Sequence, residues 1–268
     1  MEDAPVRGAP SNVRGWLSEV YLPALVAAQS KQLMRRLGER ATVDDPILGR
    51  STGTPDLPRF LERAADWLRR REASFENLAF TTGSDRDVTE GTLSLVADGK
   101  RIAVPVAVVA ERRPAREVEI RLYYSTRSLD GTRAVRTLLV PRDDDLAVPP
   151  PVAAHLNALL RGDVDGIVAS FGDGATVRDA DGVTHRKEGS GGPLRAFYER
   201  LLASRASGQA GVEVLKGARA DDGSTCALEY TVARAPGRDL AESGLAVYER
   251  GDNGLLSALR LYHDDSWL

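Results

Sequence analysis

Two aspartates at matching places in a repeated string are the first candidates for chemistry. The string ATVDD spans residues 41–45, and ATVRD recurs at 175–179. Because side chains alternate across a strand, Asp45 lies on the same face as Val43, and the same pattern holds for Asp179. We expect this apolar face to point into a pocket. Burial there raises the pKa of a carboxyl group and makes it a usable acid or base.

The residue before each of these aspartates changes the sign of its charge between the copies. Asp44 stands in the first string and Arg178 in the second. We therefore expect this position to be solvent-exposed surface. The alternative for both Asp45 and Asp179 is a turn-forming or buried, hydrogen-bonded carboxylate, since Asp is common in turns and Pro46 fixes a backbone angle that begins one.

A ring with a hydrogen-bonding tip precedes each aspartate at the same distance. Tyr21 lies 24 residues before Asp45, and His155 lies 24 residues before Asp179. Both rings fall in apolar stripes with helical spacing. A lone Tyr or His on a helix is ordinarily a core residue, but the repeated spacing favours one polar tip near each carboxyl group.

Two glutamates offer a second carboxyl group for each copy. Glu76 in ASFENLAF shares its strand face with Leu78 and Phe80, which predicts that it lies on the pocket wall. Glu213 in AGVEVLKG has a weaker pattern, and an exposed strand glutamate is the alternative for both. Glu72 and Glu188 are nearby substitutes. Two close carboxyl groups in an apolar pocket would separate their pKa values, giving one acid and one base.

These candidates belong to two copies of one structural unit. Each copy has a helical pattern after the aspartate, at 57–68 and 194–202. Each closes on a similar strand, EIRLYYS at 119–125 and ALRLYHD at 258–264. Helices followed by antiparallel strands predict an α+β unit with helices packed on one face of a curved sheet.

Prolines and charges mark the junction between the copies. The string VPRDDDLAVPPP is typical of an extended linker. We predict a first domain at 11–138, a proline-rich linker at 139–151 and a second domain at 152–268.

Composition excludes several classes of function. With 36 basic and 39 acidic residues, the 268-residue chain has no basic field for nucleic acid. Cys226, the one cysteine, is expected in the core, and neither a signal peptide nor a membrane-spanning run is evident. We expect a soluble, cytoplasmic protein without nucleic-acid or membrane partners. His185 and His263 are expected to be exposed, and no metal or other cofactor is implied.

The run ALLRGDVDGIVASFGDGATVRDADG, followed by LRAFYERL, resembles the opening half of ketosteroid isomerase-type proteins in the NTF2-like (SnoaL-like) superfamily. The likeness covers residues 13–126 and 151–265. It implies two tandem cone-shaped domains of the cystatin-like type. In such isomerases a tyrosine matching Tyr21 donates to the oxyanion, whereas a second acid matches Ala107 and Ala246, so both copies lack it.

The combination of residues is similar to a narrower group, the two-domain epoxide hydrolases or cyclases of polyether biosynthesis. The resemblance matches Tyr21, Asp45 and Glu76 in one half with His155, Asp179 and Glu213 in the other. It implies that an epoxidised, hydrophobic polyketide is the substrate and that the aspartates activate the epoxide oxygen while the glutamates act as bases, or the reverse.

Three alternatives stay open at the level of sequence. An isomerase or an aldol-type polyketide cyclase could work with Tyr21 and Asp45 alone. A non-catalytic module that binds a small molecule or dimerises is the other class, because one fold can host many functions. A monomer and a homodimer are both compatible with the fused copies.

Overall fold

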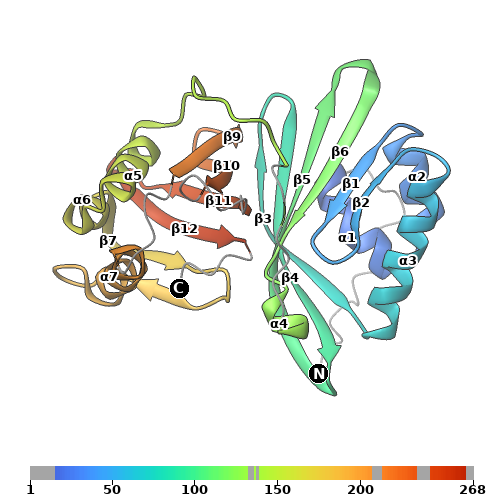
Figure 1. Cartoon of the computed structure of the whole chain (residues 1–268), viewed down its shortest axis with the longest axis horizontal. Helices are drawn as coiled ribbons and strands as arrows, with labels where there is room; N and C mark the ends of the chain where they lie inside the picture. The colour runs from blue at the N-terminus through green and yellow to red at the C-terminus, as the bar shows by residue number, and fades with distance from the viewer. Residues whose placement is uncertain (1–15, 132–135, 137–138, 207–212, 234–241, 264–268) are drawn as a thin grey trace, which may run out of the picture.

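The computed structural model describes residues 16–131, 136, 139–206, 213–233 and 242–263. The chain forms two halves, each with helices packed on a six-stranded sheet (Figure 1). The strand orders are β2-β1-β6-β5-β4-β3 and β8-β7-β12-β11-β10-β9, so the second half repeats the topology of the first. This architecture confirms the expected α+β class and the two tandem units.

The first half places its helices before most of its strands. In chain order its elements are α1 (Leu17–Val26), α2 (Ser30–Leu37), β1 (Thr42–Asp45), β2 (Gly49–Thr52), α3 (Asp56–Arg70), β3 (Ser74–Thr82), β4 (Arg86–Ala97), β5 (Lys100–Arg113), the short turn η1 (Pro114–Arg116), β6 (Glu117–Tyr123) and α4 (Arg127–Asp130). Strand β1 pairs with β6 in parallel, whereas the other neighbours are antiparallel.

The second half follows the same order. Its elements are α5 (Pro150–Arg161), α6 (Val164–Ala169), β7 (Phe171–Arg178), β8 (Thr184–Arg186), α7 (Gly192–Ala206), β9 (Glu213–Asp221), β10 (Thr225–Ala233), β11 (Glu242–Arg250) and β12 (Leu256–Tyr262). Helix α5 begins at Pro150, where the missing N–H costs nothing, and ends at Gly162 in the left-handed region with φ +67°. Asp163 then caps α6 by accepting the Gly166 amide at 2.8 Å.

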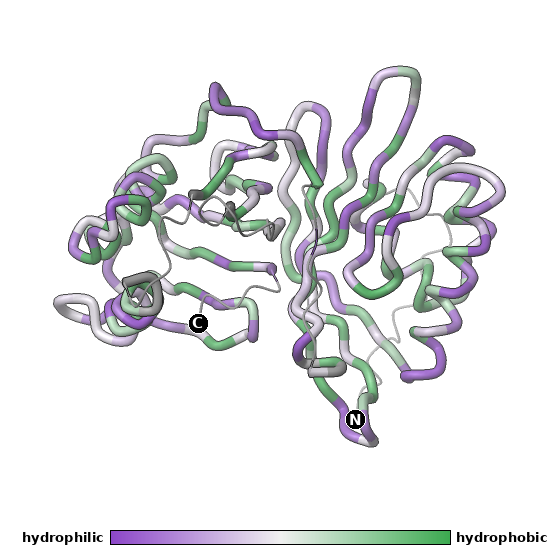
Figure 2. Tube along the Cα trace, in the orientation of Figure 1, coloured by the Kyte–Doolittle hydropathy of each residue, from purple (hydrophilic) through white to green (hydrophobic). Residues whose placement is uncertain are grey.

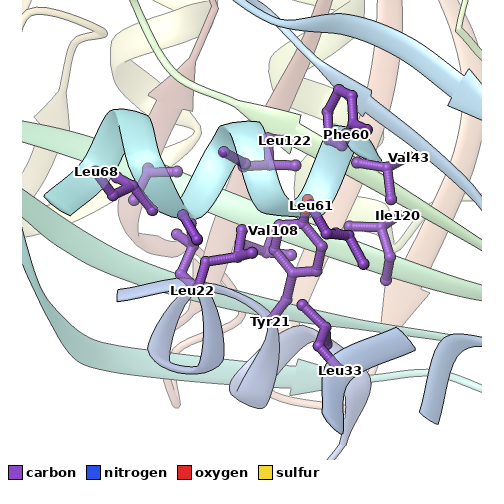
Figure 3. Packing of buried hydrophobic residues seen from close by; sticks show 14 of the residues in the cluster. Tyr21, Leu22, Leu33, Val43, Phe60, Leu61, Leu68, Val108, Ile120 and Leu122 are labelled. Carbon is purple, nitrogen blue, oxygen red and sulfur yellow. The ribbon is translucent and has the colours of Figure 1, made fainter. Parts of the chain in front are cut away.

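The core of the first half lies between α1, α2, α3 and the sheet. Figure 3 shows Tyr21 and Leu22 from α1, together with Leu61 from α3, packed against side chains of the strands. The buried residues of α3 are apolar and recur at helical spacing: Leu57, Phe60, Leu61, Ala64, Ala65 and Leu68. Each large apolar side chain buried here contributes about 1.5 to 3 kcal/mol.

A separate core of the second half surrounds α5, α6 and α7. Leu156, Phe171 and Phe197 are among its buried residues. Cys226 is fully buried in the same cluster, which confirms the prediction that it is a small core residue. The described part of the chain has no helix with the length and apolar character needed to cross a membrane.

The two sheets face each other, and the helices of each half lie on the outer side (Figure 1). Strands β3 and β4 contact β9, and β5 contacts β12. A third apolar cluster joins the halves, and includes Val88 and Val109 from the first with Ala227 and Val247 from the second. Figure 2 shows both hydrophobic and hydrophilic positions along the strands of the two sheets. Each sheet therefore has one face toward its own helices and the other toward the partner half.

Candidate functional site

A narrow apolar pocket in the first half has one carboxyl group among the described residues of its lining. It encloses about 20 Å³, room for roughly one water molecule. Asp45 lines it together with Tyr124 and Trp67. The remaining lining side chains are apolar: Leu22, Leu25, Ile47, Leu48, Ala64, Leu68, Leu93, Val106 and Leu122.

Asp45 is held by one of its two carboxyl oxygens. The Ile47 and Leu48 amides each donate to Oδ1 at 2.8 Å, and the Tyr124 hydroxyl donates to the same atom at 3.0 Å. Among the described residues no donor reaches Oδ2, so this oxygen is the one available to a ligand. Burial raises the pKa of Asp45, although its hydrogen-bond donors and Arg136 partly oppose this effect.

Two tyrosines lie close to this carboxyl group. Burial strongly raises the pKa of Tyr21 and of Tyr124, and the charge of Asp45 raises both further. Each phenol therefore stays protonated and can donate a hydrogen bond. Tyr124 lines the pocket, whereas Tyr21 is a buried core residue outside its lining. Tyr21 thus lies near Asp45 as expected, but Tyr124 makes the direct contact.

We predict that Tyr124→Phe raises the pKa of Asp45. The substitution removes a hydrogen bond that stabilises the ionised carboxylate and otherwise preserves the ring. Carbon-13 NMR of the Asp carboxyl groups measures this change, with Asp45→Asn identifying the signal. An unchanged or lowered pKa would contradict the contact between these side chains.

Glu76 does not share the pocket with Asp45, and the expected paired acids are wrong for the first half. Its side chain is exposed, while Phe75 packs against the core. The physical reason is the register of β3, an edge strand with an irregularity between Asn77 and Ala79. Alternation read through that irregularity placed Glu76 on the wrong face.

The expectation that Asp44 is exposed surface is also wrong. Asp44 is only 8% exposed and forms ion pairs with Arg136 and Arg50. Arg178, at the matching position, is half-buried and donates to the Tyr262 hydroxyl. Neither position is solvated, because each side chain is engaged by a partner from its own half.

The second half has a larger pocket, and the described residues of its lining include no carboxyl group. It encloses about 60 Å³. His155, Tyr198, Tyr230, Tyr248 and His263 supply its polar atoms. The apolar lining residues are Leu156, Leu159, Phe197, Leu201, Val214, Ala246, Leu259 and Leu261.

His155 is buried among rings and remains neutral. Its Nε2 lies 2.9 Å from the Tyr198 hydroxyl, and no described group reaches Nδ1. The rings of Phe171, Tyr198 and Tyr248 have their centroids 5.4 to 5.8 Å from the imidazole. Burial lowers the pKa of His155 to about 4. It can therefore exchange hydrogen bonds with a ligand without carrying a charge at neutral pH.

We predict that His155 makes folding stability fall in acid. Its pKa is about 4 when folded, against 6.5 as the ordinary value, so the unfolded chain binds the extra proton and stability drops as the pH falls between these values. The loss is about 2 to 3 kcal/mol by pH 4.5. Urea unfolding at pH 7 and 4.5 measures it, and His155→Gln should lose correspondingly less over that range. An equal loss in the variant would contradict the assignment.

Asp179 does not line the second pocket, contrary to expectation. It is buried in the turn after β7, where its Oδ1 accepts the Val183 amide at 2.8 Å. Its Oδ2 lies 2.9 Å from Nε2 of His185, which stacks on Phe197. The turn alternative considered from the sequence therefore describes Asp179. His185, expected to be exposed, is buried by this contact.

Other predicted positions have mixed outcomes. Glu213 begins β9, but its side chain lies outside the described structure, and its role stays a prediction. Ala107 and Ala246 are the positions matched with the second acid of the isomerases. They lie on different faces of their sheets, because Ala107 pairs with Glu90 and Ala246 pairs with Leu228. Only Ala246 lines a pocket.

Tyr124 was missed by reasoning from sequence, although a signal was present. The strings RLYY and RLYH place Tyr124 and His263 at matching positions. Both line the pocket of their own half, so the expected exposure of His263 is wrong. Together with Tyr21 and His155, they show tyrosine replaced by histidine twice between the halves. Among the described residues, no three His, Cys, Asp or Glu side chains are grouped to hold a metal ion.

Comparison with known proteins identifies similar solved structures only. No protein-family model and no curated protein matches the chain. A SnoaL-like protein of unknown function from Burkholderia thailandensis is 16% identical over 42% of this chain and 90% of that one, with a TM-score of 0.33. The epoxide hydrolase/cyclase-like enzyme SalBIII, described for pyran ring formation in polyether salinomycin, is 17% identical over 42% of this chain and 87% of its own, with a TM-score of 0.33.

An LEH-like epoxide hydrolase from M. tuberculosis is 28% identical over 42% of this chain and 80% of its own, with a TM-score of 0.33. Other similar structures are described as NTF2-like proteins and a polyketide cyclase. Each of these structures matches between 42% and 45% of this chain. Similarity at this level assigns no reaction to the chain, and the function must be inferred from its own site.

Proposed function

We propose that this chain opens epoxides in an apolar small molecule by acid–base catalysis centred on Asp45 in the first half. One observation carries the proposal: Asp45 lines an apolar pocket with Oδ1 fixed by three donors and Oδ2 without a described donor. A carboxyl group held in this way is oriented for proton transfer and has a raised pKa that favours proton acceptance.

The proposed reaction uses Asp45 and Tyr124 as a pair. Water or a substrate hydroxyl attacks an epoxide carbon, so that one C–O bond forms and the strained one breaks. Asp45 Oδ2 takes the proton of the attacking oxygen as the strained bond opens, while the Tyr124 hydroxyl keeps its proton and holds Oδ1 at 3.0 Å. Asp45 Oδ2 then passes this proton to the departing oxygen, which becomes a hydroxyl and restores the carboxylate. Tyr124 thus orients the carboxyl group in place of a Glu76 partner, and Asp45 acts first as base and then as acid.

The size of the first pocket restricts the substrate. Its volume of about 20 Å³ holds a water molecule, so an epoxidised polyketide must displace lining side chains as it enters. Two residues of that lining are Trp67, which is half-buried, and Leu68, which is buried. We propose a hydrophobic epoxide as the substrate class, because nearly all of the lining is apolar.

The second pocket is proposed to bind rather than to catalyse. Its described lining has no carboxyl group, and Asp179 is engaged by His185 outside it. Neutral His155 and the tyrosines offer hydrogen bonds to an uncharged ligand. The alternative of a non-catalytic, small-molecule-binding module is thus proposed for the second half of the chain.

Proton removal next to a carbonyl is the second candidate reaction. The single carboxyl group beside tyrosine hydroxyls favours it, because one base and one hydrogen-bond donor suffice for an enolate. Such a reaction would make the chain an isomerase or an aldol-type cyclase. Asp45 would take the C–H proton, and the Tyr124 hydroxyl would turn from Asp45 Oδ1 to donate to the oxyanion.

Isotope labelling separates the two candidates. The whole chain is incubated with a hydroxy-epoxide in ¹⁸O-water and with a β,γ-unsaturated ketone in D₂O. We expect the epoxide to be consumed, giving an unlabelled cyclic ether by ring closure or a diol with one ¹⁸O by hydrolysis. Deuterium entering the ketone without epoxide consumption would support the second candidate. No reaction of either probe above the buffer rate would overturn catalysis.

A further inference from the structure

Two buried clusters of ionic and hydroxyl groups join the halves. In the first, Glu229 on β10 accepts hydrogen bonds from Arg121 Nε at 2.6 Å, Arg121 Nη2 at 2.8 Å and the Tyr123 hydroxyl at 2.7 Å, all from β6. Arg121 is fully buried, and Glu229 and Tyr123 are nearly so. A carboxylate of the second half therefore fixes a strand of the first.

The second cluster repeats the first with the halves exchanged. Glu90 on β4 accepts from Arg260 Nε at 2.6 Å, Arg260 Nη2 at 2.8 Å and the Tyr262 hydroxyl at 2.7 Å, all from β12. The three pairs of equivalent residues are each 139 positions apart: Glu90 and Glu229, Arg121 and Arg260, Tyr123 and Tyr262. The contact between the halves is thus reciprocal.

Strand β6 has one face in this contact and the other in the first pocket. Arg121 and Tyr123 face the second half, whereas Leu122 and Tyr124 line the pocket with Asp45. Arg136 adds a second link, because its guanidinium lies 5.3 Å from the Tyr123 ring centroid and also pairs with Asp44, next to Asp45. Movement of β6 would shift Tyr124 relative to the carboxyl group.

We propose that Glu229 is a positioning residue for the first pocket: it holds β6 through Arg121 and Tyr123, and thereby keeps the Tyr124 hydroxyl on Asp45. The second half thus completes the site of the first without touching it. The geometric part of this proposal is independent of the reaction, and only its consequence for turnover rests on the proposed function.

The sign of the change in the pKa of Asp45 distinguishes positioning from a direct charge effect. Glu229→Gln removes a negative charge, which by itself lowers the pKa of a carboxyl group. Loss of the Tyr124 hydrogen bond raises it, because that bond stabilises the carboxylate. Tyr123→Phe breaks the contact with Glu229 without removing any charge.

The test measures the pKa of Asp45 by carboxyl ¹³C NMR in the whole chain without substrate. We expect Glu229→Gln and Tyr123→Phe to shift it upward, in the direction of Tyr124→Phe. Glu90→Gln and Tyr262→Phe are matched controls, since Glu90 and Tyr262 make the three corresponding contacts from equally buried positions but hold β12, and they should leave it unchanged. The clusters differ in two added contacts, because Arg86 also donates to Glu229 at 3.3 Å and Arg178 donates to Tyr262.

Two results would overturn the proposal: a pKa of Asp45 that stays unchanged or falls in Tyr123→Phe, or one that rises equally in the controls. If Glu229→Gln fails to fold, Tyr123→Phe still tests the proposal. With an active enzyme, the Glu229 and Tyr123 variants should lower kcat more than they change KM. An upward pKa shift without any epoxide turnover in the wild type would preserve the positioning role while rejecting the proposed function.

Discussion

Replacing Asp45 by Asn is expected to lower kcat for epoxide opening by about 10² to 10⁴-fold while leaving the chain folded. Asn has nearly the same shape, and its carbonyl oxygen can keep the hydrogen bonds from Ile47, Leu48 and Tyr124. It cannot take up the proton of the attacking hydroxyl. Initial rates at saturating hydroxy-epoxide measure the loss, and urea unfolding verifies the fold.

The second half supplies a matched control for this experiment. Asp179→Asn makes the same change at the repeated position, but Asp179 is bound by His185 and does not line a pocket. It should reduce stability and leave the rate per folded molecule unchanged. Wild-type turnover in Asp45→Asn, or an equal loss of turnover in Asp179→Asn, would remove Asp45 from its proposed role.

Arg121→Leu is expected to reduce the free energy of unfolding by about 3 to 5 kcal/mol. Arg121 is fully buried and pairs with Glu229 from the other half and with Glu111 and Glu119 from its own. Removing it leaves these carboxylates near one another without their central cation. Equilibrium unfolding in urea measures the change, read from the midpoint and slope together.

Substitutions of two further arginines provide comparison values for that prediction. Arg260→Leu should cost less, because the Arg260 side chain is 17% exposed where that of Arg121 is 0% exposed. Arg69 pairs with Asp66 on the surface of α3, and Arg69→Leu should leave the midpoint almost unchanged. A similar midpoint for Arg121→Leu and Arg69→Leu would show that the buried cluster does not stabilise the chain.

The fold was largely predictable because its information is local and occurs twice. The strings at 41–45 and 175–179 reveal the repeat, and the apolar spacing from Leu57 to Leu68 predicts a helix that the structure confirms as α3. Alternating runs likewise identify the strands. Periodicity of 3.6 or 2 residues is a property of the segment itself, so it survives without tertiary information.

The candidate site was predictable only where a side chain is fixed by its own segment. Asp45 lines a pocket as expected, held by amides two and three residues ahead. The exposure of Glu76 depends on the register of an edge strand, which alternation does not determine. The burial of Asp44 depends on its contact with Arg136, 92 residues further along the chain, and that contact is not visible in one segment.

The prediction that Asp45 and Asp179 are equivalent was wrong, because a neighbouring side chain binds the carboxyl group of Asp179. His185 lies six residues after Asp179 and captures its Oδ2. Sequence spacing places a residue on a strand but does not show which nearby group its side chain binds. The repeated RLY string was the clearest missed signal, since Arg121 and Tyr123 recur as Arg260 and Tyr262 across the contact between the halves.

Strands β6 and β12 each have one face toward the other half and one face toward their own pocket. This arrangement limits how the two copies of a duplicated gene can diverge. Positions that face the other copy must change together, because reversing the charge of Arg121 requires a compensating change at Glu229 in the other copy. Alternate positions face each copy's own pocket and carry no such coupling. Covariation is therefore expected between the copies at the contact, while pocket-lining positions such as Tyr124 and His263 can differ without a compensating change in the other copy.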